Sequence, residues 1–152
     1  MIRSTKSKDL VRREYEECWS DGDVEILHET CSGDVVLYGL PTAGRSSGIE
    51  ELKEYITEFR AAVSDVDVSI EDVVAEDDRV VVRSRISCTH DADVFMGVEP
   101  EGCSLEINRT TTYRIENGLI AEAWLCFDTL GLLQQMDAVP AHPQSYEWEQ
   151  LG

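Results

Sequence analysis

The chain has 152 residues, of which 31 are acidic and 13 are basic, giving a net charge of −18. A surface of this charge repels nucleic acids and anionic membranes, so neither is expected as a partner. A hydrophobic content of 42% is ordinary for a globular protein and argues against disorder. The sequence has no apolar run long enough to span a membrane and no apolar segment at its start, so we expect a cytoplasmic protein.

The length is sufficient for one domain with a single core, and we place it at residues 1–137, with a C-terminal tail at 138–152. The five cysteines are widely spaced and form no Cys-x-x-Cys pair, and no two of the three histidines are close in sequence. Reduced and mostly buried thiols are therefore expected, and no metal site.

Helices are predicted mainly in the first half of the chain. Residues 5–19 carry one broad apolar stripe, residues 24–31 suit a short helix, and residues 34–38 suit a strand. Residues 39–48 are predicted to form a loop, and Ser47 with Glu50 matches a capping box that starts the next helix. The apolar residues of that helix recur in steps of three and four: Ile49, Leu52, Ile56, Phe59 and Val63.

Strands are predicted from residue 65 onward, where the apolar period changes to two. Four of them are expected: one beginning at residue 65 and three more at 80–89, 103–116 and 119–127. The turn-rich loop at 90–102 has an apolar centre that should pack against the domain. Asn117 and Gly118 suit a two-residue type I′ turn, so the last two strands should pair antiparallel. A short helix at 128–136 follows, and the element order indicates an α+β fold.

One carboxylate stands out at the end of the last predicted strand. Every second residue along this strand shares a face. That face comprises Ile120, Glu122, Trp124, Cys126 and Asp128. A carboxylate beside Trp and Ile is poorly solvated, and burial of this kind raises a carboxyl pKa towards neutrality. Asp128 is therefore the main candidate for chemistry.

Three segments resemble the SnoaL-like polyketide (ester) cyclase family of the NTF2-like superfamily: Val94–Gly102, Tyr113–Trp124 and Asp128–Gln135. The resemblance implies an NTF2-like α+β cone, in which N-terminal helices pack over the concave face of a strongly curved, mainly antiparallel sheet. It also implies a homodimer, formed through the outer face of the sheet. Members that resemble this chain close a ring by intramolecular aldol condensation without a metal or other cofactor, and their acid/base carboxylate falls on Asp128.

The expected function is therefore that of a cyclase, or a related isomerase or lyase, acting on a small hydrophobic carbonyl compound. Asp128 is the predicted general acid/base and His90 a second catalytic candidate. The alternatives are a protein that binds a small hydrophobic molecule without catalysis and a mainly structural dimer with a filled pocket. Six residues are predicted to bind the ligand: Trp19, Tyr38, Tyr55, Phe59, Arg109 and Trp124.

Each of these assignments has a structural alternative that the sequence leaves open. A regular register after the Asn-Gly turn places residue 109 opposite residue 126, which makes Arg109 a diagonal neighbour of Asp128. An Asp–Arg pair would lower the pKa of Asp128, and Asp128 could also simply cap the last helix. His90 could be an exposed residue, and the aromatic residues could be ordinary core.

The acidic, lysine-poor composition is similar to that of proteins from microbes that accumulate salt, where screening removes the self-repulsion of a charged surface. We therefore predict that the melting temperature rises between low salt and molar salt. A thermal melt at both concentrations tests this, and an unchanged or lower melting temperature in molar salt contradicts it.

Overall fold

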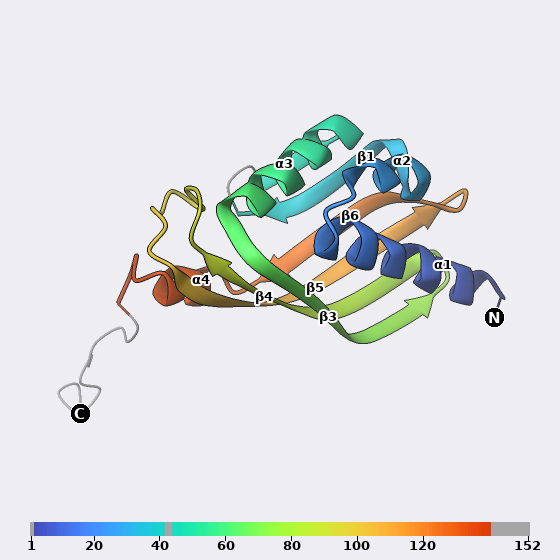
Figure 1. Ribbon diagram of the computed structural model, residues 1–152. Coiled ribbons are helices and arrows are strands. Elements are labelled where there is room, and N and C mark those ends of the chain that lie inside the picture. The colour runs from blue at the N-terminus through green and yellow to red at the C-terminus, as the bar shows by residue number, and fades with distance from the viewer. Residues whose placement is uncertain (1, 42–43, 141–152) are drawn as a thin grey trace, which may run out of the picture.

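A curved six-stranded sheet with helices in its concave face makes up the fold (Figure 1). The computed structural model describes residues 2–41 and 44–140. The helical elements are α1 (Ile2–Arg13), the π-helix η1 (Glu14–Ser20), the 3₁₀ helix η2 (Val24–Ile26), α2 (Leu27–Thr30), α3 (Ile49–Ala62) and α4 (Thr129–Gln135). The strands are β1 (Cys31–Leu40), β2 (Gly44–Ser47), β3 (Val63–Glu76), β4 (Arg79–His90), β5 (Cys103–Glu116) and β6 (Leu119–Phe127).

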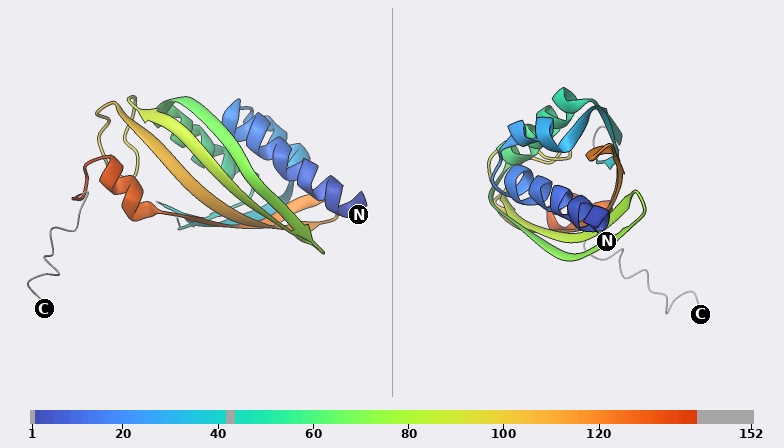
Figure 2. Two further views of the ribbon diagram at one scale, coloured as in Figure 1. Left: turned by 90° about the horizontal axis from the view of Figure 1, so that it is seen from below. Right: turned by 90° about the vertical axis from the view of Figure 1, so that its right-hand side faces the viewer.

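The strand order is β2-β1-β6-β5-β4-β3, and the sheet is not closed. All neighbouring strands are antiparallel except β1 and β6, which run parallel. Figure 2 shows the long strands curving around α1 and α3, with α4 at one end of the molecule. The predicted α+β arrangement, with helices over the concave face of a mainly antiparallel sheet, is confirmed.

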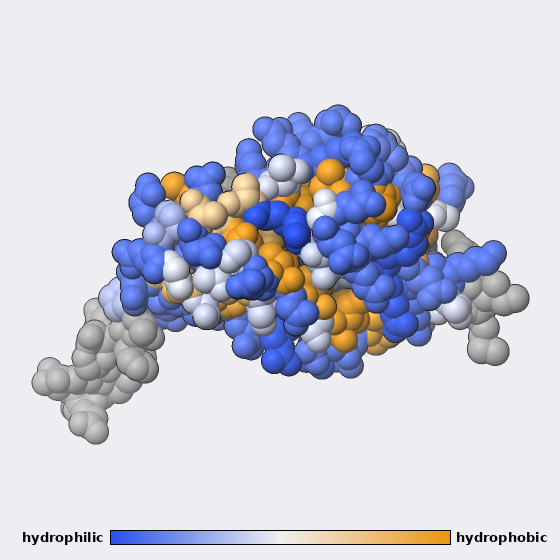
Figure 3. All heavy atoms as spheres, in the orientation of Figure 1, coloured by the Kyte–Doolittle hydropathy of each residue, from blue (hydrophilic) through white to orange (hydrophobic). Residues whose placement is uncertain are grey.

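The core lies between this concave face and the apolar stripes of the helices. Val80, Val82 and Ile86 alternate along β4 and are almost fully buried, as are Leu52 and Ile56 of α3. Charged residues occupy the opposite positions of the strands, so the exterior in Figure 3 is mostly hydrophilic. Burying this apolar side of each element is the main driving force for the fold.

A β-bulge in β6 determines which side chains of this strand face the core. The Asn117-Gly118 turn is type I′ as predicted, with φ of 52° and 76° and with Glu116 opposite Leu119. The register then shifts, because Ile115 pairs with Ile120 but Arg114 pairs with Glu122, which leaves Ala121 as an extra residue. One extra residue moves every later side chain of the strand to the opposite face of the sheet. Ala123, Leu125 and Phe127 therefore face inwards.

Two predictions in the segment before α3 are wrong in detail. The predicted loop at 39–48 contains the edge strand β2, which pairs with β1. The capping box of Ser47 and Glu50 is also not formed, because Gly48 is the N-cap and has no side chain to contribute. Instead, the Ser47 N–H donates to Glu51 Oε2 at 2.7 Å. Glu51 thus supplies the carboxylate that the predicted capping box assigned to Glu50.

The other predicted elements agree with the structure to within a few residues. The first predicted helix corresponds to α1 and η1, and the predicted strands at 80–89, 103–116 and 119–127 correspond to β4, β5 and β6. All five cysteines are free. Most of the C-terminal tail predicted at 138–152 lies outside the described residues.

Asp128 forms the N-cap of α4. Its Oδ1 accepts a hydrogen bond of 2.8 Å from the Gly131 N–H, and its side chain is exposed. This contact satisfies one of the backbone donors that every helix start leaves free. The alternative in which Asp128 caps the last helix is therefore confirmed.

We predict that Asp128→Ala destabilises the fold by about 1 kcal/mol, because it removes the cap. The stability of Asp128→Asn should stay within a few tenths of a kcal/mol of the wild-type value, because Asn is an equally good N-cap. Urea unfolding of the two variants beside the wild type measures the difference. Equal stability of Asp128→Ala and Asp128→Asn would contradict the capping role.

Candidate functional site

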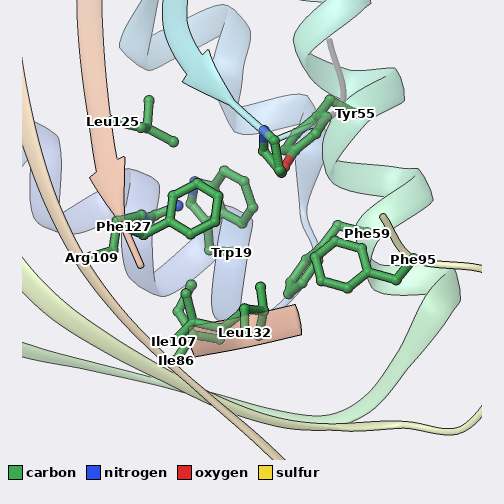
Figure 4. A pocket seen from close by; sticks show the side chains of 11 residues that line it. Trp19, Tyr55, Phe59, Ile86, Phe95, Ile107, Arg109, Leu125, Phe127 and Leu132 are labelled. Carbon is green, nitrogen blue, oxygen red and sulfur yellow. The ribbon is translucent and has the colours of Figure 1, made fainter. Parts of the chain in front are cut away.

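An apolar pocket lies between the concave face of the sheet, η1, α3 and α4 (Figure 4). Its lining residues are Trp19, Pro41, Tyr55, Phe59, Ile86, Phe95, Ile107, Arg109, Leu125, Phe127 and Leu132. The cavity volume is about 30 Å³, which is room for about two water molecules. Of the predicted ligand-binding residues, Trp19, Tyr55, Phe59 and Arg109 line it.

Two wider depressions, of about 390 and 370 Å³, lie elsewhere on the molecule. The first is lined largely by hydroxyl and carboxylate side chains near the ends of β4 and β5, and the second lies between the end of α1 and β3. Neither has a buried charged side chain in its lining. The apolar pocket is therefore the stronger candidate in spite of its smaller volume.

Among the described residues that line the apolar pocket, Arg109 is the only charged one, and it is only 5% exposed. Its guanidinium carbon lies 5.0 Å from the ring centroid of Tyr15 and 4.7 Å from that of Trp19, which are cation–π distances. Within the described part of the chain, its buried Nε and Nη2 have no hydrogen-bond partner. Buried charged donors without acceptors are costly, so a ligand oxygen is the natural completion of this site.

Glu14 is a second buried charged group close to this site, and it is only 2% exposed. It begins the π-helix η1, in which residues five apart lie one above the other, so Glu14 and Trp19 come together. The Trp19 Nε1–H donates to Glu14 Oε1 at 3.4 Å, while Oε2 has no partner among the described residues. Burial raises the pKa of Glu14, and the Arg109 cation opposes that rise.

The pocket offers hydrogen-bond donors but no base. Burial raises the pKa of Tyr55 to about 12, so its hydroxyl is neutral near pH 7 and can donate. Figure 4 shows this hydroxyl directed from α3 towards the pocket. Arg109 is permanently charged and is also a donor only. No carboxylate or histidine is among the described residues that line the pocket.

The bulge in β6 changes the predicted positions of three residues. Trp124 is 37% exposed and stacks on Tyr38, with ring centroids 5.8 Å apart, outside the pocket. Asp128 is exposed and caps α4, so the predicted hollow shared by Asp128 and Trp124 is not present. Arg109 pairs with Phe127 rather than with residue 126, and it forms no ion pair with Asp128. These corrections have one cause, the residue inserted at Ala121.

His90 is fully buried, so the alternative of an exposed histidine is wrong. Its Nε2 lies 2.8 Å from the carbonyl oxygen of Asp93, and its ring packs edge-on against Phe95 at 6.1 Å. Phe95 in turn contacts Phe59 at 5.5 Å between ring centroids. His90 thus supports the loop whose apolar centre forms one wall of the pocket, as predicted for that loop, but it is not among the lining residues.

Sequence reasoning missed Glu14 and Tyr15 as parts of the site. A signal for Glu14 was present, because it follows Val11 by three residues and precedes Cys18 by four, and both are buried. A charged residue within such an apolar stripe is buried with it. The cation–π contact of Tyr15 has no comparable signal, because it depends on a strand almost 100 residues later in the chain.

Two kinds of feature are absent from the described residues. None of the described helices combines the length and the hydrophobicity needed to cross a bilayer. The same part of the chain contains no group of three or more His, Cys, Asp or Glu side chains arranged to hold a metal ion.

The fold is shared with several solved structures. A protein from Jannaschia sp. CCS1 assigned as a SnoaL-like polyketide cyclase is 24% identical, with a TM-score of 0.78 over 90% of this chain and 95% of that one. IdmH from Streptomyces antibioticus, assigned as a polyketide cyclase, is 28% identical, with a TM-score of 0.73 over 86% of this chain and 98% of that one. AclR from Streptomyces galilaeus, assigned as a hydroxylase, is 23% identical, with a TM-score of 0.79 over 97% of this chain and 91% of that one.

No curated protein sequence matches this chain significantly. The family model for the SnoaL-like polyketide cyclases matches residues 9–136, which is most of the chain and includes every residue that lines the pocket. The NTF2-like fold that the sequence predicted is confirmed by the solved structures. This chain belongs to the SnoaL-like polyketide cyclase family.

Proposed function

We propose that the protein is a cofactor-independent cyclase of the aldol type, or a related isomerase or lyase, acting on a small hydrophobic carbonyl compound. The observation that carries this proposal is that Nε and Nη2 of the buried Arg109 guanidinium have no hydrogen-bond partner among the described residues, in an otherwise apolar pocket. A carbonyl oxygen of the ligand would accept hydrogen bonds from it. Solved relatives assigned as polyketide cyclases support the reaction class.

The chemistry begins with removal of a proton from the carbon next to the carbonyl. The electron pair of the C–H bond moves to form an enolate, and the negative charge on its oxygen is stabilised by Arg109, with Tyr55 as a second donor. The enolate carbon attacks a second carbonyl of the same molecule and closes the ring. The alkoxide formed there then takes up a proton. Desolvation inside the pocket strengthens the interaction of Arg109 with each oxyanion.

The group that moves the proton is proposed to be Asp128, as the family resemblance implies. Asp128 directly follows Phe127 and precedes Leu132 by one turn of α4, and both of these neighbours line the pocket. To act as a base it must exchange its hydrogen bond with the Gly131 N–H for a contact with the ligand. A ligand larger than the present cavity, which displaces Phe95 or Phe127, would bring its reacting carbon towards this end of the pocket.

A second candidate function is binding of a small hydrophobic molecule without catalysis. It is favoured by the lining itself, in which the described residues supply donors and aromatic rings but no base. The two candidates share the role of Arg109. They differ only in whether Asp128 exchanges a proton with the bound compound.

We predict that the protein accelerates exchange of the α-protons of 2-indanone with solvent deuterium, followed by proton NMR. This exchange is the first half of any aldol or enolisation reaction and needs no knowledge of the natural substrate. Arg109→Met removes the cation but keeps a long side chain, and should lower the rate by about 10²-fold or more. Asp128→Asn keeps the helix cap. If Asp128 is the base, this variant should lower the exchange rate by about 10²–10⁴-fold.

The outcomes separate the candidates. Loss of exchange in both variants supports the cyclase, whereas exchange that survives Asp128→Asn removes Asp128 from the mechanism. If the wild type binds 2-indanone but exchanges none of its protons, the non-catalytic binder is the correct assignment. Equal affinity of the wild type and of Arg109→Met for 2-indanone would contradict both candidate functions.

We also propose that the chain forms a homodimer through the outer face of the sheet. This face carries Trp124 stacked on Tyr38 and the 63% exposed Val74, whereas most of the exterior is charged. Light scattering after size-exclusion chromatography should give the mass of two chains for the wild type and the mass of one chain for Trp124→Asp. Leu130→Asp is a matched control, because Leu130 is 59% exposed on α4. A single-chain mass for the wild type contradicts the proposal.

A further inference from the structure

Glu14 and Arg109 are two buried groups of opposite charge that do not touch. Each is at least 95% buried, yet the pair has no N···O distance of 4.0 Å or less. Trp19 links them, because its ring lies against the guanidinium and its Nε1–H donates to the carboxyl group. The carboxylate is therefore close enough to affect the cation electrostatically, but it leaves Nε and Nη2 of Arg109 without a hydrogen-bond partner among the described residues.

We propose that Glu14 is a positioning residue that balances the charge of Arg109 in the empty pocket, and that an oxyanion of the ligand replaces it as the partner of that cation. The inference rests on the proposed function, because it takes Arg109 as the group that meets the ligand. It adds a substrate class: compounds with an acidic oxygen, such as a carboxylate or the enolate of a 1,3-dicarbonyl, are favoured over neutral ketones.

The physical reason is the cost of two negative charges beside one buried cation. When a ligand oxyanion binds Arg109, an ionised Glu14 loses part of the attraction that kept it charged in a desolvated position. Glu14 then takes up one proton from solvent, and the buried cluster keeps one positive and one negative charge. By linkage, ionisation of Glu14 must weaken oxyanion binding by the same factor.

The other titratable groups that face Glu14 do not change charge near neutrality. They are Arg109 and Tyr113 on β5, Cys18 on η1 and Cys31 on β1. Burial raises the pKa of Cys18 to about 12 and raises the pKa of Cys31 and of Tyr113 as well. Burial raises the pKa of Glu14 as well, but from the low starting value of a carboxyl group, so Glu14 is the member of this cluster whose charge changes when the ligand binds.

The test uses benzoate as the oxyanion probe and benzamide as its neutral counterpart, with affinities measured by calorimetry from about pH 5 to pH 9. In the wild type, benzoate affinity should fall with rising pH, by up to about tenfold per pH unit once Glu14 ionises in the free protein. Glu14→Gln should bind benzoate with an affinity independent of pH. Glu16→Gln is the matched control, since Glu16 is exposed on the same helix, and it should keep the wild-type profile.

A second measurement needs only the wild type and so does not depend on the folding of Glu14→Gln. Titration of benzoate in two buffers with different heats of ionisation should show uptake of close to one proton in the range where the affinity falls. No proton uptake, or a wild-type pH profile identical to that of Glu14→Gln, overturns the inference while leaving Arg109 as the binding group. Benzoate binding no stronger than that of benzamide also overturns the inference, because it removes the preference for an oxyanion. Benzoate and benzamide binding that are both unaffected by Arg109→Met overturn the proposed site as well.

Discussion

The burial of Arg109 between two aromatic rings is the interaction on which the site depends. A guanidinium has to be compensated when it leaves water, and here the compensation comes from the faces of Tyr15 and Trp19. Both rings belong to η1, so the position of this short helix determines what the cation meets. Arg60 of α3 fixes that position by donating to the carbonyl oxygens of Trp19 and Ser20 at 2.6 and 3.0 Å.

The unusual geometry of η1 has a direct chemical effect. Because a π-helix aligns residues five apart, Glu14 lies on the same side as Trp19 and comes under the influence of Arg109. In an α-helix the neighbours of Glu14 would be three and four residues away. The carboxyl group would then face a different part of the core. Local helix geometry thus brings the carboxyl group of Glu14 to Trp19, on the side of the core where Arg109 lies.

Most of the architecture was predictable from periodicity, and the site was only partly so. The long strands and α3 carry clear periods, and the type I′ turn follows from Asn117 and Gly118. The bulge at Ala121 has no such signal, because Ile120 and Ala121 are both apolar and both buried. One residue decides which face of β6 meets the core. The sequence therefore placed Arg109 beside the pocket, where the structure also has it, but it placed Trp124 and Asp128 on the pocket side, whereas both are exposed outside it.

Membership of a family indicates the scaffold more firmly than the reaction, because one fold accommodates many different sites. The solved relatives have less than 30% sequence identity with this chain, and their assignments include both cyclases and a hydroxylase. This chain buries two charged groups beside its pocket, Glu14 and Arg109. Assignment of its chemistry depends on them more than on the shared fold.

The parallel pairing of β1 with β6 has a consequence for how the chain folds. Tyr38 and Trp124 are register partners, so strands from opposite ends of the sequence must meet before the sheet is complete. Contacts of such large separation form late and slowly, since a long loop has to close first. The pocket takes its walls from both of these ends. It therefore forms only when both strands are in place, and no fragment that lacks β1 or β6 would contain it.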